Sequence, residues 1–381
     1  MSFGIKTIKF VISITLFGAI VSCGNEDSPF NQTEDLIVDF SFTPQEVLID
    51  SIIQFNNESR GIDSNTSHEW DFGDDNTSSE KSPSHKYTNL GEFVVRLTEN
   101  NGSQINTVSK LVVTSLSDEI QGRNGLIEAL NNQGNKILVC AHRAFHKNAP
   151  ENSIAAINSA IDYEIGMVEI DVRLSKDGEL ILMHDATVNR TTNGVGKITD
   201  LTFEQLKQFK LLDQYNNFTN ENIPSLKEAL LTSRGKIFID LDVKIENYSK
   251  VYGVIKQYGM LSQVMFTIDN VTVGKTLIDL NNRSIIFPIV KSQSDYNTYI
   301  DSNLNISVMQ FNSTALKDNV LVEIARNSDI SIFGNIYINT TTTPETDKFS
   351  QVDNFINLGG SIIQTDYPLL VKSYLKYNNL N

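Results

Sequence analysis

The sequence predicts an α/β protein: a (β/α)8 TIM barrel with a hairpin insertion after strand 2, preceded by a small all-β sandwich. Three observations predict this architecture. From residue 136 onward, apolar strand-like runs alternate with helical patterns. One pair of these runs is joined by a turn too short for a crossover between parallel strands. Before residue 117 the chain carries only short alternating runs separated by polar turn clusters.

The amino-terminal residues have the features of a bacterial secretion signal. Two lysines precede an apolar stretch, residues 10–21, that is too short to span a bilayer with ease. The run Ile20-Val21-Ser22-Cys23-Gly24 then resembles a bacterial lipobox, which implies cleavage before Cys23 and acylation of its sulfur. We expect a lipoprotein signal peptide over 1–22 and a polar tether over 23–34. An ordinary signal peptide or an uncleaved anchor is the alternative.

Two or more acyl chains anchor a protein stably to a membrane. We therefore expect the protein to be held by lipid in the bacterial cell envelope, on the outer membrane, facing either the periplasm or the cell surface. Removing residues 1–22 deletes two lysines and no acids, which takes the formal charge from −15 to −17. Without a basic stripe to neutralise phosphates, nucleic acid is not expected as a partner. With Cys23 lipidated, Cys140 has no partner for an internal disulfide.

Residues 35–116 are predicted to form the β-sandwich. The run Trp70-Asp71-Phe72-Gly73-Asp74-Asp75, followed by Gly91-Glu92-Phe93-Val94-Val95, looks like a PKD (polycystic kidney disease) repeat. We expect Trp70 and Phe72 to be core residues, and the acids around Gly73 to shape a turn; calcium binding by those acids is the alternative. The resemblance implies a spacer, or a module that makes weak surface contacts. Residues 117–135 are predicted to be a linker with one or two helical turns.

Residues 136–381 are predicted to form the barrel. The candidate strands are 137–141, 167–172, 179–183, 237–243, 264–268, 285–290, 306–311, 330–338 and 361–365, and helical patterns include 153–163, 226–231, 248–258 and 347–358. Nine strands are one too many. Only four residues separate Leu174 from Glu179, so these two runs must form an antiparallel hairpin, which leaves eight parallel strands. With Asp177-Gly178 as a two-residue loop, residue i pairs with 355 − i, which predicts that Asp171 lies opposite His184.

Polar residues at the strand ends are predicted to form one site. Glu169 and Asp171 leave one face of the second strand, and Asp240, Asp242 and Lys244 share a face of the next barrel strand. An oxygen-rich set of carboxylates suits a hard divalent cation, Ca²⁺ or Mg²⁺.

Two histidines and an arginine extend this site. Arg143 and Lys244 would clamp a phosphate, and His142 and His184 would exchange protons with the reacting oxygens. Any one of these residues could be a solvated surface charge or a histidine that only fills space. Six such residues at corresponding positions of the first three barrel strands and the hairpin are better explained by a functional site.

These motifs resemble the glycerophosphodiester phosphodiesterase (GDPD) family. The motifs are His142-Arg143, Pro150-Glu151-Asn152, Glu169-Ile170-Asp171-Val172, Lys176-Asp177-Gly178, His184-Asp185 and Arg190-Thr191-Thr192. The resemblance implies a barrel enzyme that uses a divalent metal to hydrolyse glycerophosphodiesters to glycerol 3-phosphate and an alcohol. By motif match, His142 and His184 take the acid and base roles, and Glu169, Asp171 and Asp242 bind the metal. Substrate binding falls to Arg143, Lys244 and Glu151.

Three positions depart from the family pattern. Ala144 replaces the usual glycine after His-Arg. Asp242 replaces the usual glutamate, and its shorter carboxylate leaves Asp240 as a second candidate for the third ligand. A tryptophan expected near the seventh strand is absent, and Tyr337 is expected to line the substrate pocket instead. Two other functions stay open: an envelope phospholipase of the same barrel superfamily, and a non-catalytic binding or adhesion lipoprotein with a decayed site.

Overall fold

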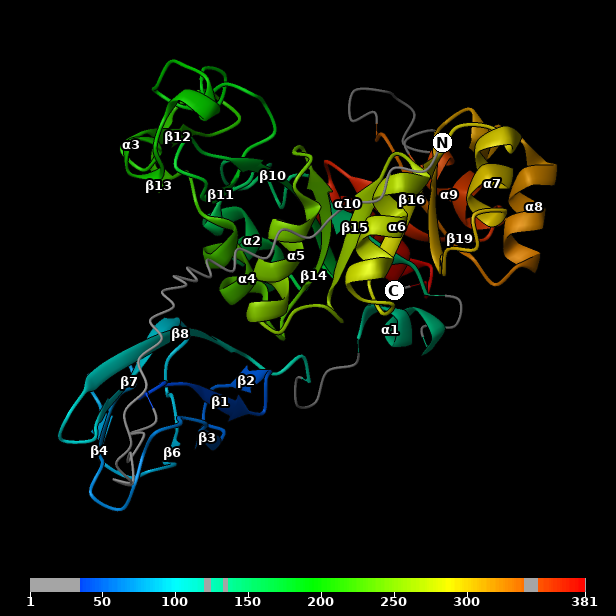
Figure 1. Ribbon diagram of the computed structural model, residues 1–381. Helices are drawn as coiled ribbons and strands as arrows, with labels where there is room; N and C mark the ends of the chain where they lie inside the picture. The colour runs from blue at the N-terminus through cyan, green and yellow to red at the C-terminus, as the bar shows by residue number, and fades with distance from the viewer. Residues whose placement is uncertain (1–34, 120–124, 133–135, 339–348, 381) are drawn as a thin grey trace, which may run out of the picture.

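The structure is a computed structural model that describes residues 35–119, 125–132, 136–338 and 349–380 (Figure 1). The expected signal peptide, tether and lipidation site at Cys23 therefore lie outside the described residues. Within the described ranges, none of the helices combines the length and the apolar character needed to cross a bilayer.

The first domain is an all-β sandwich, as predicted. One sheet has the order β1-β3-β6 and the other β2-β8-β7-β4-β5. Their strands are β1 (Phe40–Thr43), β2 (Val47–Leu48), β3 (Ile53–Asn57), β4 (Ser67–Asp71), β5 (Thr77–Ser78), β6 (Ser84–His85), β7 (Glu92–Asn100) and β8 (Ile105–Ser115). Trp70 and Phe72 are fully buried between the sheets, and Gly73 turns the chain at φ +77° with its N–H on the Asp71 carboxylate. The aromatic core and the turn expected from the sequence are both present.

The second domain is a closed barrel of eight parallel strands. Its order is β10-β14-β15-β16-β17-β18-β19-β9, and pairing of β9 with β10 closes the ring. The strands are β9 (Leu138–Ala141), β10 (Met167–Leu174), β14 (Phe238–Val243), β15 (Val264–Ile268), β16 (Ile285–Val290), β17 (Val308–Phe311), β18 (Ser331–Asn335) and β19 (Gly360–Thr365). The predicted strand count is confirmed, because the ninth candidate strand, β11 (Leu180–Leu182), pairs antiparallel with β10 at the edge.

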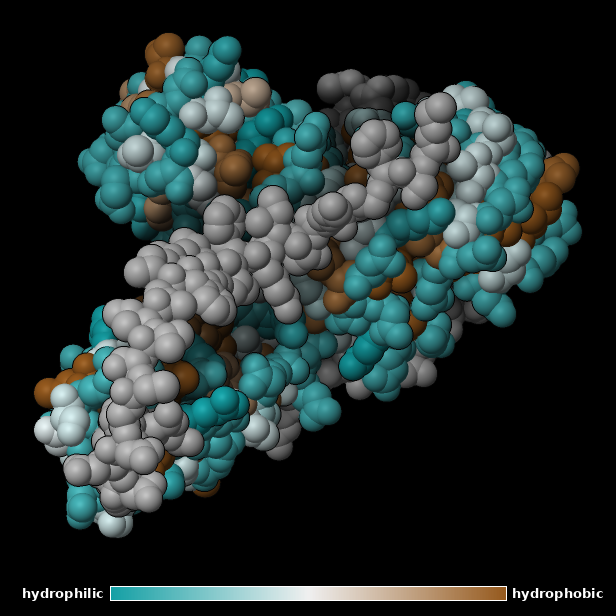
Figure 2. Space-filling model, viewed as in Figure 1, coloured by the Kyte–Doolittle hydropathy of each residue, from teal (hydrophilic) through white to brown (hydrophobic). Residues whose placement is uncertain are grey.

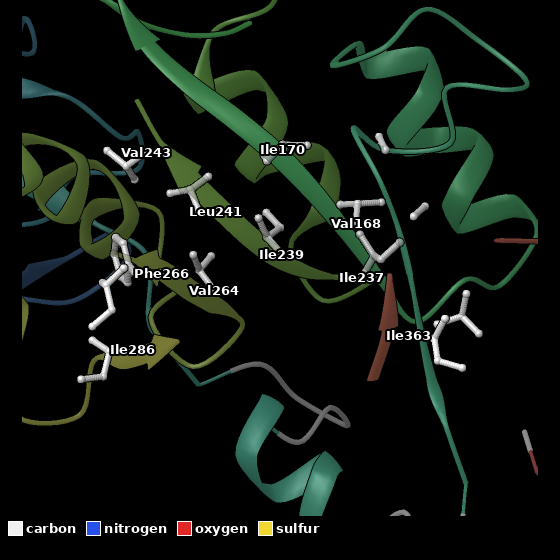
Figure 3. Packing of buried hydrophobic residues seen from close by; sticks show 14 of the residues in the cluster. Val168, Ile170, Ile237, Ile239, Leu241, Val243, Val264, Phe266, Ile286 and Ile363 are labelled. Atoms are coloured by element: carbon white, nitrogen blue, oxygen red, sulfur yellow. The ribbon is translucent and has the colours of Figure 1, made fainter. Parts of the chain in front are cut away.

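Helices cover the outside of the barrel. They are α2 (Ile154–Asp162), α4 (Leu226–Ser233), α5 (Tyr248–Gln257), α6 (Val271–Leu280), α7 (Gln293–Ile300), α8 (Asn319–Asn327), α9 (Ser350–Asn357) and α10 (Pro368–Tyr377). The strands turn alternate side chains outward, and Figure 3 shows Val168, Ile170, Ile239 and Leu241 in this outward-facing layer. Burial of each such side chain contributes about 1.5–3 kcal/mol to folding. This layer fixes the strand register on which the site depends.

The amino-terminal end of the barrel is closed by a separate apolar cluster. Inward-facing residues from all eight strands form its floor: Cys140, Met167, Phe238, Met265, Phe287, Val308, Phe333 and Ile362. Helix α1 (Leu126–Asn132), which lies in the predicted linker, packs Leu126 and Leu130 against this floor (Figure 1). Cys140 is buried there, and burial raises the pKa of its thiol well above the ordinary value. Because apolar side chains fill this end of the barrel, a polar site inside the barrel can lie only at the opposite, carboxyl end of the strands.

The β10–β11 hairpin has a different register from the one predicted. Leu174 pairs with Leu180, and Ser175 and Glu179 close a three-residue loop, Lys176-Asp177-Gly178, with Gly178 at φ +86°. A glycine with positive φ after a turn is typical of three-residue hairpin loops. The predicted two-residue loop is therefore wrong. Asp171 lies opposite Met183, whose N–H bonds its carbonyl, and not opposite His184.

After β11 the chain forms an insertion with a small core of its own. It contains η1 (Ile198–Asp200), α3 (Phe203–Leu206), β12 (Lys210–Leu212) and β13 (Phe218–Asn222). The buried apolar residues are Ile181, Met183, Val188, Ile198, Leu206, Leu211 and Ile223. The insertion projects beside the carboxyl end of β10 (Figure 1) and carries His184 at its start.

Candidate functional site

Three carboxylates meet at the carboxyl end of the barrel strands. Glu169, Asp171 and Asp242 each offer an oxygen, and these oxygens all lie within 4.8 Å of one another. We call these residues the acid trio. The parallel register explains the meeting, because Asp171 of β10 is level with Asp242 of β14, and Glu169 is level with Asp240. Glu169 and Asp171 are buried, with exposed fractions of 5% and 1%.

The acid trio carries more negative charge than its neighbours balance. Its ion pairs within the described residues come from Lys244, which lies 3.2 Å from Asp171 and also bonds Asp242, and from His142. Burial, reinforced by the charge of Asp171, raises the pKa of Glu169 well above its ordinary value. Buried carboxylates that repel one another favour a bound cation. An all-oxygen donor set of this kind fits Ca²⁺ or Mg²⁺.

Asp240, the second candidate for the third ligand, is engaged elsewhere. Its carboxylate accepts a 2.7 Å hydrogen bond from the Thr267 hydroxyl on β15, and it is not one of the three converging acids. Burial raises the pKa of Asp240 to about 8 although this hydrogen bond opposes the rise. Asp242 is therefore the better placed of the two for a metal.

The loop after β9 supports the acid trio from the side. The Arg143 backbone N–H donates to Glu169 Oε2 at 2.7 Å. Asn152 Nδ2 donates to Asp171 Oδ2, and Asn152 Oδ1 accepts from the Asp171 backbone N–H. To do so, Arg143, Ala144 and Asn152 adopt left-handed backbone, with φ of 49°, 60° and 53°. Ala144 is buried in this conformation. The position where the family pattern has glycine is thus one where positive φ is required.

His142 directly follows β9 and faces the acid trio. Its Nε2 lies 3.9 Å from Glu169 Oε2, while its Nδ1 bonds Asp366 Oδ1 at 2.8 Å. A carboxylate accepts hydrogen bonds only, so Nδ1 carries the proton and Nε2 is free to exchange one. His146 lies beside this pair: its Nδ1 donates to the His142 carbonyl, and its Nε2 lies 3.7 Å from Asp366. Asp366 therefore orients His142.

His184 is held by a parallel arrangement at the start of the insertion. Its Nδ1 bonds Asp185 Oδ1 at 2.7 Å. Its backbone carbonyl accepts from both Nε and Nη2 of Arg173, at 2.9 and 2.7 Å. Nε2 of His184 is again the nitrogen left for proton transfer.

Arg143 and Glu151 contact each other at the mouth of the barrel. Arg143 Nη1 lies 3.2 Å from Glu151 Oε1, whereas Arg143 Nε is buried and has no hydrogen-bond partner among the residues that the structure describes. Arg190 bonds both oxygens of Glu151 at 2.8 Å. Burial alone would raise the pKa of Glu151, but its bonds to Arg190 and Arg143 hold it below the ordinary value. Glu151 thus contacts the two arginines, and its expected role in substrate binding stays a prediction.

Tyr337 borders a small cavity next to His142. The cavity is lined by His142, Asn335, Ile336, Tyr337, Gln364, Thr365 and Asp366. The tyrosine side chain is largely exposed, so it can contact a ligand that enters from solvent. Contact of Tyr337 with the substrate stays a prediction.

The structure brings the sequence-predicted residues to one end of the barrel and adds several that orient them. Asp185 bonds the His184 ring, and its position next to His184 in the sequence is a signal for this contact. Asp366 bonds the His142 ring from a distant part of the chain, which no local motif indicates. Nothing in the local sequence indicated the bond from Arg173 to His184. Together the residues present carboxylates that could hold a cation, basic groups and two imidazoles, which suits cleavage of a phosphate ester.

Comparisons with known proteins agree on both domains. Residues 142–318 match the model of the glycerophosphoryl diester phosphodiesterase family, and residues 38–115 match the PKD domain. The chain is 38% identical over 143 residues to the glycerophosphodiester phosphodiesterase of Caldanaerobacter subterraneus subsp. tengcongensis, a match over 35% of this chain and 59% of that protein. It is 39% identical over 127 residues to glycerophosphodiester phosphodiesterase 1 of Bos taurus, over 32% and 38% of the two chains.

The fold is also similar to solved structures. A glycerophosphoryl diester phosphodiesterase from Parabacteroides distasonis superimposes with a TM-score of 0.61 and 25% identity, covering 67% of this chain and 93% of that one. By sequence, in contrast, the chain spans between about two fifths and three fifths of the two curated relatives above.

Proposed function

Because residues 142–318 form a domain of the glycerophosphoryl diester phosphodiesterase family, we propose that the protein is a metal-dependent phosphoric diester hydrolase. Its substrates would be glycerophosphodiesters, and its products glycerol 3-phosphate and an alcohol. The observation that carries the proposal is the convergence of the acid trio with Lys244 and His142 at the carboxyl end of β9, β10 and β14. Catalytic residues in (β/α)8 barrels lie at this end.

Glu169, Asp171 and Asp242 would hold the ion, Ca²⁺ or Mg²⁺. A divalent ion bound there supplies positive charge to a phosphate oxygen. Two observations support a divalent ion at this place. Three carboxylates converge, of which two are buried, and among the described residues Lys244 is the lysine that pairs with them, so their negative charge is only partly neutralised.

Two basic side chains of the site would bind the phosphate. Lys244 already lies between Asp171 and Asp242, so its ammonium is at the edge of the proposed cation site. Arg143 reaches Glu151 with one nitrogen and keeps a buried Nε without a partner, a donor that a phosphate oxygen would satisfy. Tyr337 and Glu151 would border the substrate, Glu151 by fixing Arg143.

His142 and His184 would move the protons. One Nε2 would accept a proton from the attacking water as its oxygen bonds phosphorus, and the other would donate a proton to the leaving alcohol oxygen as its bond to phosphorus breaks. Because each Nδ1 is bonded to a carboxylate, each ring is held in one tautomer with Nε2 available. Proton transfer of this kind contributes roughly 10²–10⁴-fold to the rate.

We also propose that the enzyme is anchored to a membrane of the bacterial cell envelope through lipid on Cys23. The support is the lipobox-like run Ile20-Val21-Ser22-Cys23-Gly24 after a short apolar stretch. The PKD domain would then act as a spacer with weak surface contacts.

Cleavage of intact phospholipids is the less favoured activity. On the face seen in Figure 2, the insertion is mainly hydrophilic, with single apolar side chains among polar ones. Its exposed large apolar residues are Val195, Tyr215 and Phe218. Val195 is distant in the sequence from the β12–β13 hairpin that carries Tyr215 and Phe218, and three such residues do not indicate the continuous apolar rim that insertion into a bilayer requires.

The test is an assay of the purified chain on glycerophosphocholine and glycerophosphoethanolamine. We expect release of glycerol 3-phosphate with Ca²⁺ or Mg²⁺ and none with EDTA. His142→Asn, His184→Asn and Asp242→Asn should each lower kcat by about 10²-fold or more. Asp200→Asn is the matched control, because the Asp200 side chain is exposed on η1. Cleavage of intact phospholipid instead, or no metal-dependent release, would contradict the proposal.

A further inference from the structure

A continuous line of hydrogen-bonded charged side chains connects His184, on the insertion, to Arg143, in the loop after β9. Asp185 bonds His184, Arg190 bonds Asp185, and Arg190 also bonds Glu151, which contacts Arg143. Arg190 uses Nε and Nη2 for Asp185, at 2.8 and 3.0 Å, and Nη1 and Nη2 for Glu151, both at 2.8 Å. One guanidinium therefore holds two carboxylates, each through both of its oxygens.

We propose that Arg190 is a positioning residue, which orients His184 through Asp185 and Arg143 through Glu151. This inference rests on the proposed phosphodiesterase function, since it assigns a role in that reaction to a residue that does not touch the substrate. It goes beyond the family match, which identifies only the reaction.

The planar fork of a guanidinium makes the geometry specific. A bidentate pair fixes the plane and direction of the carboxylate as well as its distance. With Asp185 fixed on one side, the bond to Nδ1 sets the plane of the His184 ring and the direction of Nε2. With Glu151 fixed on the other, the guanidinium of Arg143 is directed along the mouth of the barrel. A shift of about 1 Å in such groups can lower a rate about 10²-fold.

The charges of this line balance one another. Asp185 and Glu151 supply two negative charges, and Arg190 and Arg143 supply two positive ones. The hydrogen bond from Arg190 is the largest cause that holds the pKa of Asp185 well below its ordinary value. The line is also connected to the barrel itself, because Arg173 of β10 holds the carbonyl of His184.

The first test is the pH dependence of kcat in two opposite variants. Arg190→Gln leaves the negative charge of Asp185 without its arginine partner, and this charge stabilises the imidazolium form of His184. The part of the kcat–pH curve that reports ionisation of His184 should therefore move to higher pH. Asp185→Asn removes that charge, so the limb moves to lower pH. Arg173 on β10, which bonds the His184 carbonyl, is the same in both variants. Damage to the fold would not move the limb in opposite directions.

The second test separates charge from geometry. Arg190→Lys keeps the positive charge but cannot bridge two carboxylates in the same plane. We expect its pH limb to lie near that of the wild type while kcat stays reduced about 10-fold or more, and KM rises because Arg143 is also released. The double variant Arg190→Gln/Asp185→Asn should be less impaired than the product of the two single effects. Lys207→Ala, which removes the ion pair between Lys207 of the insertion and Glu228 of α4, is the matched control.

A third measurement does not depend on turnover. Nitrogen-15 NMR of histidine-labelled protein reports which ring nitrogen of His184 carries the proton. In the wild type the neutral ring should carry it on Nδ1, and in Arg190→Gln the two tautomers should become mixed. The proposal is overturned if Arg190→Gln behaves like Lys207→Ala in kcat, pH profile and tautomer. A wild type without activity but with the tautomer change would contradict the proposed reaction and leave the positioning by Arg190 supported.

Discussion

At the scale of single residues, the site is built on two carboxylate–imidazole pairs. His142 bonds Asp366, and His184 bonds Asp185, each through Nδ1. The second pair is adjacent in the sequence, so it could be predicted. The first joins residues 224 positions apart and forms only because β19 lies next to β9 when the barrel closes. Its recognition from the sequence would have required the strand order as well as the motif.

Replacement of Asp366 by asparagine should impair catalysis with little effect on folding. The amide group introduced by this substitution can donate to Nδ1 of His142, which favours the tautomer with its proton on Nε2 and removes the free nitrogen. We expect kcat of Asp366→Asn to fall about 10²–10⁴-fold, with KM changed far less. Steady-state kinetics on a glycerophosphodiester measure this, with Asp200→Asn as control. An unchanged kcat would show that Asp366 does not orient His142.

The buried acids also predict how stability depends on pH and metal. The pKa of Asp240 is about 8 in the folded protein, mainly because of burial, against about 4 in the unfolded chain. Between these values the folded state holds a proton that the unfolded state lacks, so stability falls as pH rises from about 4 to 8. The raised pKa of Glu169 acts in the same direction.

The measurement is thermal unfolding at pH 5, 6.5 and 8, with EDTA or with excess Ca²⁺ or Mg²⁺. In EDTA we expect Tm to decrease steadily across this series. A bound cation neutralises the carboxylates, so the metal should raise Tm most at pH 8. A constant Tm in EDTA from pH 5 to 8 would contradict the raised pKa values of Asp240 and Glu169, and no effect of the metal at pH 8 would mean that the acid trio is not the cation site.

At the scale of secondary-structure elements, patterns gave the strands but not every register. The limits of β15 and β16 agree with the sequence prediction, because both are short apolar runs bounded by polar residues. The β10–β11 hairpin was predicted as an element, but its loop has three residues instead of two. Asp177-Gly178 fits both loops, and Ser175 decides between them by bonding the backbone of Glu179. A one-residue change of this kind shifts His184 relative to Asp171.

Two glycine-to-alanine substitutions should change stability in opposite directions. Gly178 closes the hairpin at φ +86°, where alanine is strained, so Gly178→Ala should lower the free energy of unfolding by about 1 kcal/mol. Gly253 lies inside α5, and an added methyl would meet nothing within 4 Å. Gly253→Ala should therefore raise the free energy of unfolding by about 0.5–1 kcal/mol. Urea unfolding measures both, and a loss of stability in both would contradict the argument.

At the scale of the whole molecule, the β-sandwich is joined to the barrel by backbone contacts. Leu116, at the end of β8, donates to the Gln257 carbonyl at the end of α5, and Ser262 donates to Asp118. Lys256 adds an ion pair to Glu46 in the sandwich. The sequence indicated both domains and the linker between them, because each domain has its own periodicity. It did not indicate these contacts or the packing of α1, which join segments without a shared pattern.

Gly259 lies at the centre of this junction and predicts how strongly the two domains are coupled. It adopts φ +59°, and a methyl group there would stand 2.3 Å from the Ser117 carbonyl oxygen, so the linker would have to move. Gly102, in the turn between β7 and β8, has φ +84° and no atom within 4 Å of an added methyl. Gly102→Ala therefore measures the backbone strain alone, about 1 kcal/mol, and Gly259→Ala measures strain plus displacement of the linker.

By calorimetry, we expect Gly259→Ala to separate the unfolding of the sandwich from that of the barrel, whereas Gly102→Ala should only lower the transition of the sandwich. If both variants show the same change in their unfolding transitions, the two domains unfold independently in the wild type. The contacts around Ser117 would then add nothing to the stability of the protein.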